Sequence, residues 1–115
     1  MRTKAQHRQT LVLSFPDHRL NLARITELQT RLHPLVTRSN QEIILDLRHI
    51  LWIDCSAVGC LISMNQLALT NRSRLVLTNL TGNVQLLADT LNLSEIINIV
   101  NTEKHPSNFK QCLNC

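Results

Sequence analysis

The strongest constraint on the fold is the stretch EIILDL (Glu42–Leu47), a continuous apolar run of the length of one strand. A run of this kind suits a central strand that is covered on both faces, because a half-exposed strand would alternate apolar and polar residues. After RHILWI the chain reaches Asp54, Cys55 and Ser56, and a largely apolar segment of helical length follows. The sequence therefore predicts a buried strand that leads to a strand-to-helix corner carrying a carboxylate, a thiol and a hydroxyl.

Further strands and helices alternate along the chain. Strands are expected at Leu11–Phe15, Arg74–Leu80 and Ile96–Val100, and helices near 21–34, 55–69 and 81–91. This order predicts a single α/β domain with a mixed sheet of four to five strands flanked by helices. The domain is expected to span residues 11–100, between a basic N-terminal segment (1–10) and a polar C-terminal tail (101–115).

Apolar residues at spacings of three and four define the inner faces of these three helices. The expected inner faces include Leu22, Leu69 and Leu91. Trp52, the single Trp, is expected to be half-buried under the corner, with contact to a partner as the alternative.

Composition excludes several classes of protein. Two glycines cannot build a glycine-rich phosphate loop, and no nucleotide-binding glycine motif occurs. Neither a signal-peptide apolar region nor an apolar run of about 18 residues is present, so no membrane insertion and a cytoplasmic location with reduced cysteines are expected. The formal charge is +4, but the arginines are scattered and one Trp and two Phe are the only aromatics. Nucleic-acid binding is therefore not expected.

The corner contains two residues of types that are common at the N-terminus of a helix. Asp54 is suited to cap the unpaired N–H groups of the following helix, and Ser56 would lie in its first turn. A phosphate on Ser56 would be tolerated by the helix dipole, whereas Asp54 and any acidic partner surface would oppose it. From spacing alone, a simple helix cap is the favoured interpretation of Asp54 and Ser56.

The stretch IILDLRHILWIDCSAVGCLISMNQLALTNRSRLVLTNLTGNVQLLADTLNLSEIINI resembles the core of a STAS domain, of the anti-sigma-factor antagonist type. That family has an apolar strand ending in Asp-Leu, then Asp-Ser-Ser-Gly-Leu-Gly opening a helix, then Leu-Val-Leu in a strand. RLNLARITELQTRL also resembles the first helix of the family, so the similarity covers about residues 11–100. The sequence departs from the motif at Cys55, Ala57, Val58 and Asn92, and the first two changes alter the surface that a partner would meet.

The resemblance implies a phosphorylation-controlled protein-binding switch without an active site or cofactor of its own. It implies phosphorylation at Ser56 and partner binding by Asp54, Cys55, Ser56, Ala57 and Val58. The implied partners are an anti-sigma factor that is also a serine kinase, and a serine phosphatase. The alternative is an accessory subunit of a bacterial lipid-transport ABC system, which the same family resemblance allows. Whether the protein is a monomer or a dimer stays open.

Two other groups of residues, the cysteines and the histidines, give weaker evidence for a functional site. Cys112 and Cys115 form a C-x-x-C pair at the chain end, with Cys55, Cys60 or His105 as possible further ligands, but a single pair does not define a metal site. The five histidines are scattered, and no nucleophile stands beside an oriented base. Neither a metal site nor a catalytic site is expected.

Overall fold

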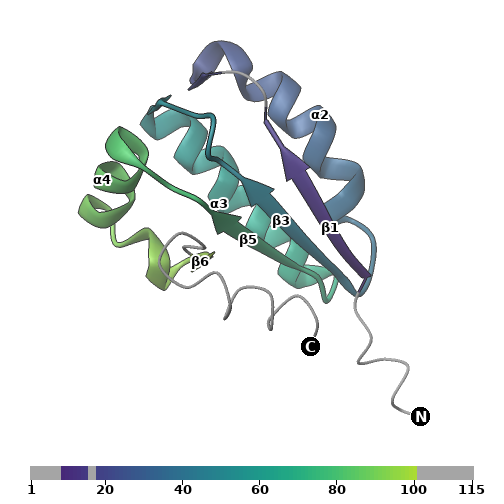
Figure 1. Ribbon diagram of the computed structural model, residues 1–115. Helices are drawn as coiled ribbons and strands as arrows, with labels where there is room; N and C mark the ends of the chain where they lie inside the picture. Colours follow the sequence, from purple (N-terminus) through teal and green to yellow (C-terminus); the bar gives the residue numbers. More distant parts are fainter. Residues whose placement is uncertain (1–8, 16–17, 101–115) are drawn as a thin grey trace.

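The computed structural model describes residues 9–15 and 18–100. Its main sheet contains four strands in the order β1-β3-β5-β6, all side by side in Figure 1. They are β1 (Gln9–Ser14), β3 (Gln41–Asp46), β5 (Arg74–Thr78) and β6 (Asn98–Val100). The predicted α/β architecture with four strands and flanking helices is confirmed.

The strand directions differ from the mixed sheet that the sequence predicted. Every pair between described strands is parallel. The reason is the helix between each strand of the main sheet and the next, because a helical crossover returns the chain to the same end of the sheet. All four strands therefore direct their carboxyl ends toward one edge.

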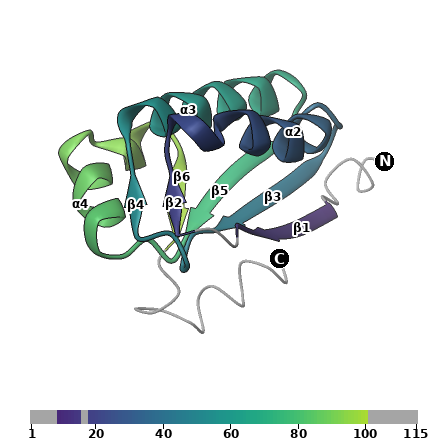
Figure 2. The same ribbon diagram turned by 90° about the horizontal axis from the view of Figure 1, so that it is seen from above.

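Two long helices cover one face of this sheet. Figure 2 shows α2 (Ile25–Val36) and α3 (Cys55–Thr70) above β3 and β5, while α4 (Gly82–Thr90) lies beyond the sheet, near β4. The core between the layers is aliphatic: Leu28 and Leu32 from α2 and Leu61 from α3 are fully buried. In β3 the successive residues Ile43, Ile44 and Leu45 are all buried, as the apolar run predicted.

A second, smaller sheet joins the loops that precede α2 and α3. It pairs β2 (Arg19–Leu20) with β4 (Trp52–Ile53) in parallel. A short 3-10 helix, η1 (Leu22–Arg24), leads from β2 into α2, and another, η2 (Leu93–Glu95), precedes β6. The chain thus contains two successive units with the same order of elements: a strand, a short strand and a helix. The two units pack side by side.

Three leucines expected on inner helix faces are exposed instead. Leu22 is 70% exposed, Leu69 55% and Leu91 41%. Leu22 lies in η1, outside the periodicity of α2, Leu69 lies in the last turn of α3, and Leu91 follows the last residue of α4. Across the two described ranges, no helix is both long and apolar enough to cross a membrane.

Candidate functional site

Asp54 is the centre of the corner. It has extended dihedral angles as the N-cap of α3, and its Oδ1 accepts a hydrogen bond from the Ala57 N–H at 3.0 Å. The predicted cap is therefore confirmed. The second carboxylate oxygen, Oδ2, accepts from the Leu22 N–H at 3.2 Å, so one side chain also ties η1 to the start of α3. This bridge joins residues far apart in sequence and gives Asp54 a fixed orientation.

The backbone of the corner comes from two chain segments. The His18 carbonyl oxygen accepts from the Leu51 N–H at 2.7 Å and from the Trp52 N–H at 3.2 Å, and the Leu20 carbonyl oxygen accepts from the Asp54 N–H at 3.3 Å. These bonds hold the segment before α2 against the segment before α3. The corner is consequently a composite of both, whereas the sequence motif indicated only the second.

The structure separates the five residues predicted to bind a partner. Cys55 and Ser56 are exposed and Asp54 is partly exposed, but Ala57 is fully buried and Val58 is 4% exposed. A helix turns about 100° per residue, so the residues that follow Ser56 rotate into the core. The assignment of the Ala57 and Val58 side chains to partner contact is thereby corrected, and they pack under the corner.

The exposed side chains around Asp54 come from both segments. Arg19 and Trp52 are register partners in the small sheet, so their side chains share one of its faces, and Trp52 keeps 51% of its surface exposed. Leu22 lies beside Asp54 through the hydrogen bond described above. We call these exposed side chains the corner surface; its members are Arg19, Leu22, Trp52, Cys55 and Ser56.

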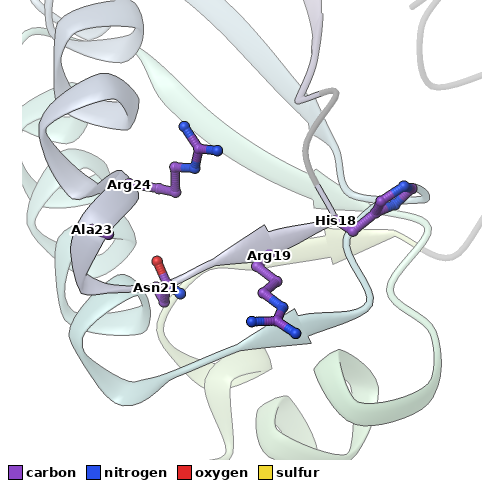
Figure 3. A pocket seen from close by; sticks show the side chains of 5 residues that line it. All are labelled: His18, Arg19, Asn21, Ala23 and Arg24. Carbon is purple, nitrogen blue, oxygen red and sulfur yellow. The ribbon is translucent and has the colours of Figure 1, made fainter.

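A cavity opens in the first of the two segments. It measures about 510 Å³ and is lined by His18, Arg19, Asn21, Ala23 and Arg24, with their side chains shown in Figure 3. Arg19 and Arg24 contribute guanidinium groups to this lining, and the charge of Arg24 is paired with Glu27 at 3.3 Å. The signal for this cavity in the sequence is the stretch HRLNLAR, which carries a histidine and two arginines and lies outside the motif that predicts the corner.

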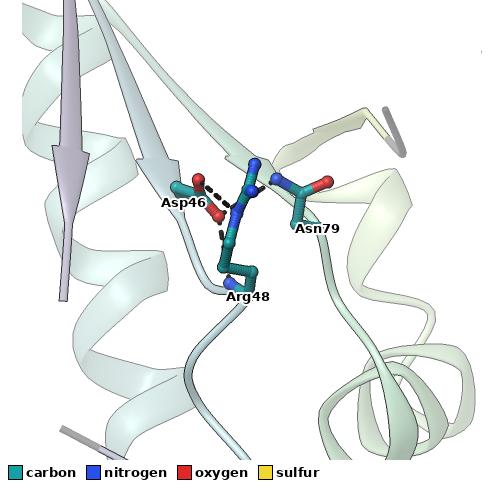
Figure 4. A network of polar contacts seen from close by, with 3 residues as sticks. All are labelled: Asp46, Arg48 and Asn79. Atoms are coloured by element: carbon teal, nitrogen blue, oxygen red, sulfur yellow. Dashed lines mark hydrogen bonds and ion pairs between the residues drawn. The ribbon is translucent and has the colours of Figure 1, made fainter. Parts of the chain in front are cut away.

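A second polar network lies at the carboxyl ends of β3 and β5. Asp46 Oδ1 accepts from the Arg48 N–H at 3.0 Å and from Asn79 Nδ2 at 3.1 Å, and Oδ2 accepts from Arg48 Nε at 2.9 Å (Figure 4). Asn79 has a φ of 62°, a left-handed conformation that asparagine tolerates. Because both carboxylate oxygens are engaged inside the fold, this network is structural.

The two cysteines of the described region have opposite environments. Cys55 is exposed at the first position of α3, whereas Cys60 is buried and its burial raises the pKa of the thiol. No group of three or more His, Cys, Asp or Glu that could hold a metal ion occurs in residues 9–15 and 18–100. His105, Cys112 and Cys115, considered as ligands from the sequence, lie outside the described residues.

This difference predicts selective alkylation. Since the thiolate is the nucleophile, iodoacetamide at about pH 8 should modify Cys55 at least about tenfold faster than the buried Cys60. Mass spectrometry of peptides from the native protein measures each site separately, and the same labelling in urea provides the control in which the rates converge. Equal rates in the native protein would contradict the placement of Cys60 in the core.

Comparisons with known proteins agree with this architecture. The family model described as STAS domain matches residues 2–105. Among solved structures, an anti-sigma-factor antagonist (STAS) domain protein from Planctomyces limnophilus has a TM-score of 0.72 at 13% identity, covering 83% of this chain and 85% of that one. A sulfate transporter family protein from Wolinella succinogenes has a TM-score of 0.70 at 12% identity, covering 92% and 88%.

A third structure is similar to a lesser degree. It is a candidate anti-sigma factor antagonist from Thermotoga maritima, with a TM-score of 0.62 at 17% identity, covering 76% of this chain and 77% of that one. No curated protein matches the chain in sequence. At such identities the three structures establish a shared fold.

Proposed function

Because the chain belongs to the STAS domain family, we propose that it is an anti-sigma-factor antagonist that acts in the cytoplasm and binds an anti-sigma factor through the corner surface. In the proposed cycle the partner is also a serine kinase, and it phosphorylates Ser56. The phosphate ends the binding, and a serine phosphatase restores it. The protein itself is a substrate and a binding module.

The observation that carries the proposal is the placement of Ser56. Its side chain is exposed in the first turn of α3, two residues after the cap at Asp54. A kinase needs a hydroxyl that it can reach, and Ser56 meets this requirement beside an ordered backbone. The adjacent Ala57 and Val58 anchor the turn in the core, so the hydroxyl is presented from a rigid position.

Electrostatics at the corner explains how a phosphate would act as a switch. A phosphoserine carries a charge of about −1.5 to −2 at neutral pH, and the N-terminus of α3 tolerates that charge. The carboxylate of Asp54 lies in the same turn and already accepts the Ala57 N–H. The phosphate would therefore extend toward solvent. A partner that packs against the corner and excludes water from it would meet this charge.

Substitutions at Ser56 test the proposal. With a purified kinase-type anti-sigma factor from the same organism, Ser56→Ala should abolish phosphorylation but leave the dissociation constant within about twofold, since it adds no charge. Ser56→Asp should raise the dissociation constant about tenfold, because it carries part of the charge of a phosphate. Isothermal titration calorimetry and phosphopeptide mass spectrometry give the two readouts.

Ser63 offers a matched control. It is exposed on the same helix, two turns further from the corner, so Ser63→Asp adds the same charge without entering the proposed interface. Stoichiometric phosphorylation of the Ser56→Ala variant at another residue, or tight binding by Ser56→Asp, would contradict the switch. A constitutive partner, as in the lipid-transport alternative, would then be the better hypothesis.

A further inference from the structure

The face of the main sheet that points away from α2 and α3 carries a row of three apolar side chains. Ile43 and Leu45 belong to the core beneath the helices, and side chains alternate along a strand, so Ile44 lies on the opposite face. Ile44 is the register partner of Val12 in β1 and of Val76 in β5. Ile44 is only 2% exposed and Val76 3%, whereas Val12 is 59% exposed. The row is therefore covered over β3 and β5 and open over β1.

The described helices lie on the wrong side to provide this cover. The helices that pack against β3 and β5 are α2 and α3, and both lie on the same face of the sheet (Figure 2). Within residues 9–15 and 18–100, no helix lies over the other face of these two strands. A central parallel strand that is buried on both faces needs a layer on each face. Another segment must therefore supply the second layer.

The apolar row is a narrow strip between two polar groups of the sheet. On one side, Glu42 accepts a hydrogen bond from Thr10 Oγ1 at 3.3 Å, and its other oxygen lies 3.3 Å from Arg74 Nε. On the other side is the network of Asp46, described above. A strip one side chain wide, with polar groups along both margins, fits a single short amphipathic segment better than a broad apolar surface.

Residues 101–115 are placed to reach this strip. They follow β6 directly, and Val100 at the end of β6 is the register partner of Thr78, two residues beyond Val76. The distance from Val100 to Ile44 is two strand spacings across and two residues back, or about 12 Å. Six residues can span about 20 Å, so residues 101–106 suffice as a connection. Residues 16–17 are too few to form a layer, and residues 1–8 contain only Met and Ala as apolar residues.

The sequence of this segment carries an apolar face of matching size. Phe109, Cys112 and Leu113 recur at spacings of three and four, which places them on one side of a helix. Ser107 precedes them as a residue type that favours the start of a helix. Gln111 falls on the opposite side.

We propose that residues 107–113 dock as an amphipathic helical segment over β3 and β5, with Phe109 and Leu113 in contact with Ile44 and Val76. Cys112 lies at the same contact and is shielded from solvent. The segment is thus the second layer of the domain, and it closes the apolar strip to other proteins. Val12 stays exposed because the segment does not extend over β1.

Alkylation of the full chain tests the contact. In the reduced native protein, iodoacetamide should modify Cys112 at least about tenfold more slowly than Cys115, which lies off the proposed face. Phe109→Ser should raise the rate at Cys112 to that at Cys115, whereas Gln111→Ser should leave both rates unchanged. Tandem mass spectrometry resolves the two cysteines, and thermal melting verifies that each variant folds.

Paired valine variants locate the contact on the sheet. Val76→Ala and Val12→Ala remove the same two methyl groups from one row, at a covered and at an open position. Phe109→Ala should lower the urea midpoint by the same amount in the wild type and in the Val12→Ala background. In the Val76→Ala background it should lower the midpoint about half as much, because substitutions of residues in contact are not additive.

The outcomes are independent of any partner protein, so failure of the proposed function leaves this inference in place. Equal alkylation of Cys112 and Cys115 in the native chain would overturn the contact, as would full additivity of Phe109→Ala with Val76→Ala. Protection of Cys112 that is lost on about hundredfold dilution of the protein would overturn a contact within one chain. It would assign the cover to a second copy, because only association between chains depends on concentration.

Discussion

Replacement of Asp46 by alanine should lower the free energy of unfolding by about 3 kcal/mol. The Asp46 residue is only 8% exposed, and its carboxylate accepts three hydrogen bonds, from the Arg48 N–H, Arg48 Nε and Asn79 Nδ2. Alanine removes all three acceptor contacts at once, at the point where β3 leaves the sheet. Urea denaturation followed by circular dichroism measures the loss.

A matched variant distinguishes the buried carboxylate from its exposed partner. Arg48→Ala removes one ion pair, but the Arg48 side chain is 57% exposed and its backbone N–H stays in place. This variant should lose no more than about 1 kcal/mol, the usual scale for an exposed pair. Equal losses for both variants would show that the Arg48 guanidinium, rather than the carboxylate that accepts three hydrogen bonds, holds this edge of the sheet.

Asp54→Ala should lower the free energy of unfolding by about 2 kcal/mol, since the variant loses the cap of α3 and the bridge to η1 together. Asp54→Asn keeps one oxygen that can accept from the Ala57 N–H at the position of Oδ1, but it has no second acceptor for the Leu22 N–H. Its loss should stay below about 1 kcal/mol. The same denaturation assay compares the two variants.

The pair of Asp54 variants also separates structure from charge at the corner. Asp54→Asn removes the negative charge with little loss of stability, so any change in partner affinity reports electrostatics. A loss of stability as large as that of Asp54→Ala would contradict this use of the variant. It would mean that the bridge to η1, rather than the cap, dominates the contribution of Asp54.

Local features of the fold were predictable from the sequence. The run Ile43–Leu45 predicted a buried strand, and Asp54 before a helical pattern predicted a cap; both are confirmed. Each prediction depends on the order of neighbouring residues alone. Asn92, which lies just after the end of α4, has a left-handed conformation with a φ of 53°, as asparagine often does after a helix.

Features that depend on contacts between distant segments were not predictable. The motif presented residues 54–58 as one contiguous surface, but the rotation of α3 buries Ala57 and Val58. The contribution of Arg19 and Leu22 arises only when β2 pairs with β4, which brings together residues about thirty positions apart. Parallel strand direction is likewise set by the crossovers, and the apolar pattern of a single strand does not encode it.

The pairing of β2 with β4 makes loop length a determinant of recognition. The register of β1 with β3 and that of β2 with β4 differ by one residue, so the second segment carries one residue more between its two strands. Surface loops usually tolerate insertions and deletions. Here, deletion of a residue between β3 and β4 would shift the small sheet by one position and exchange the faces of Trp52 and Ile53. Chains of this fold could therefore diverge in partner choice through a single-residue gap, with every side chain of the corner surface retained in the sequence.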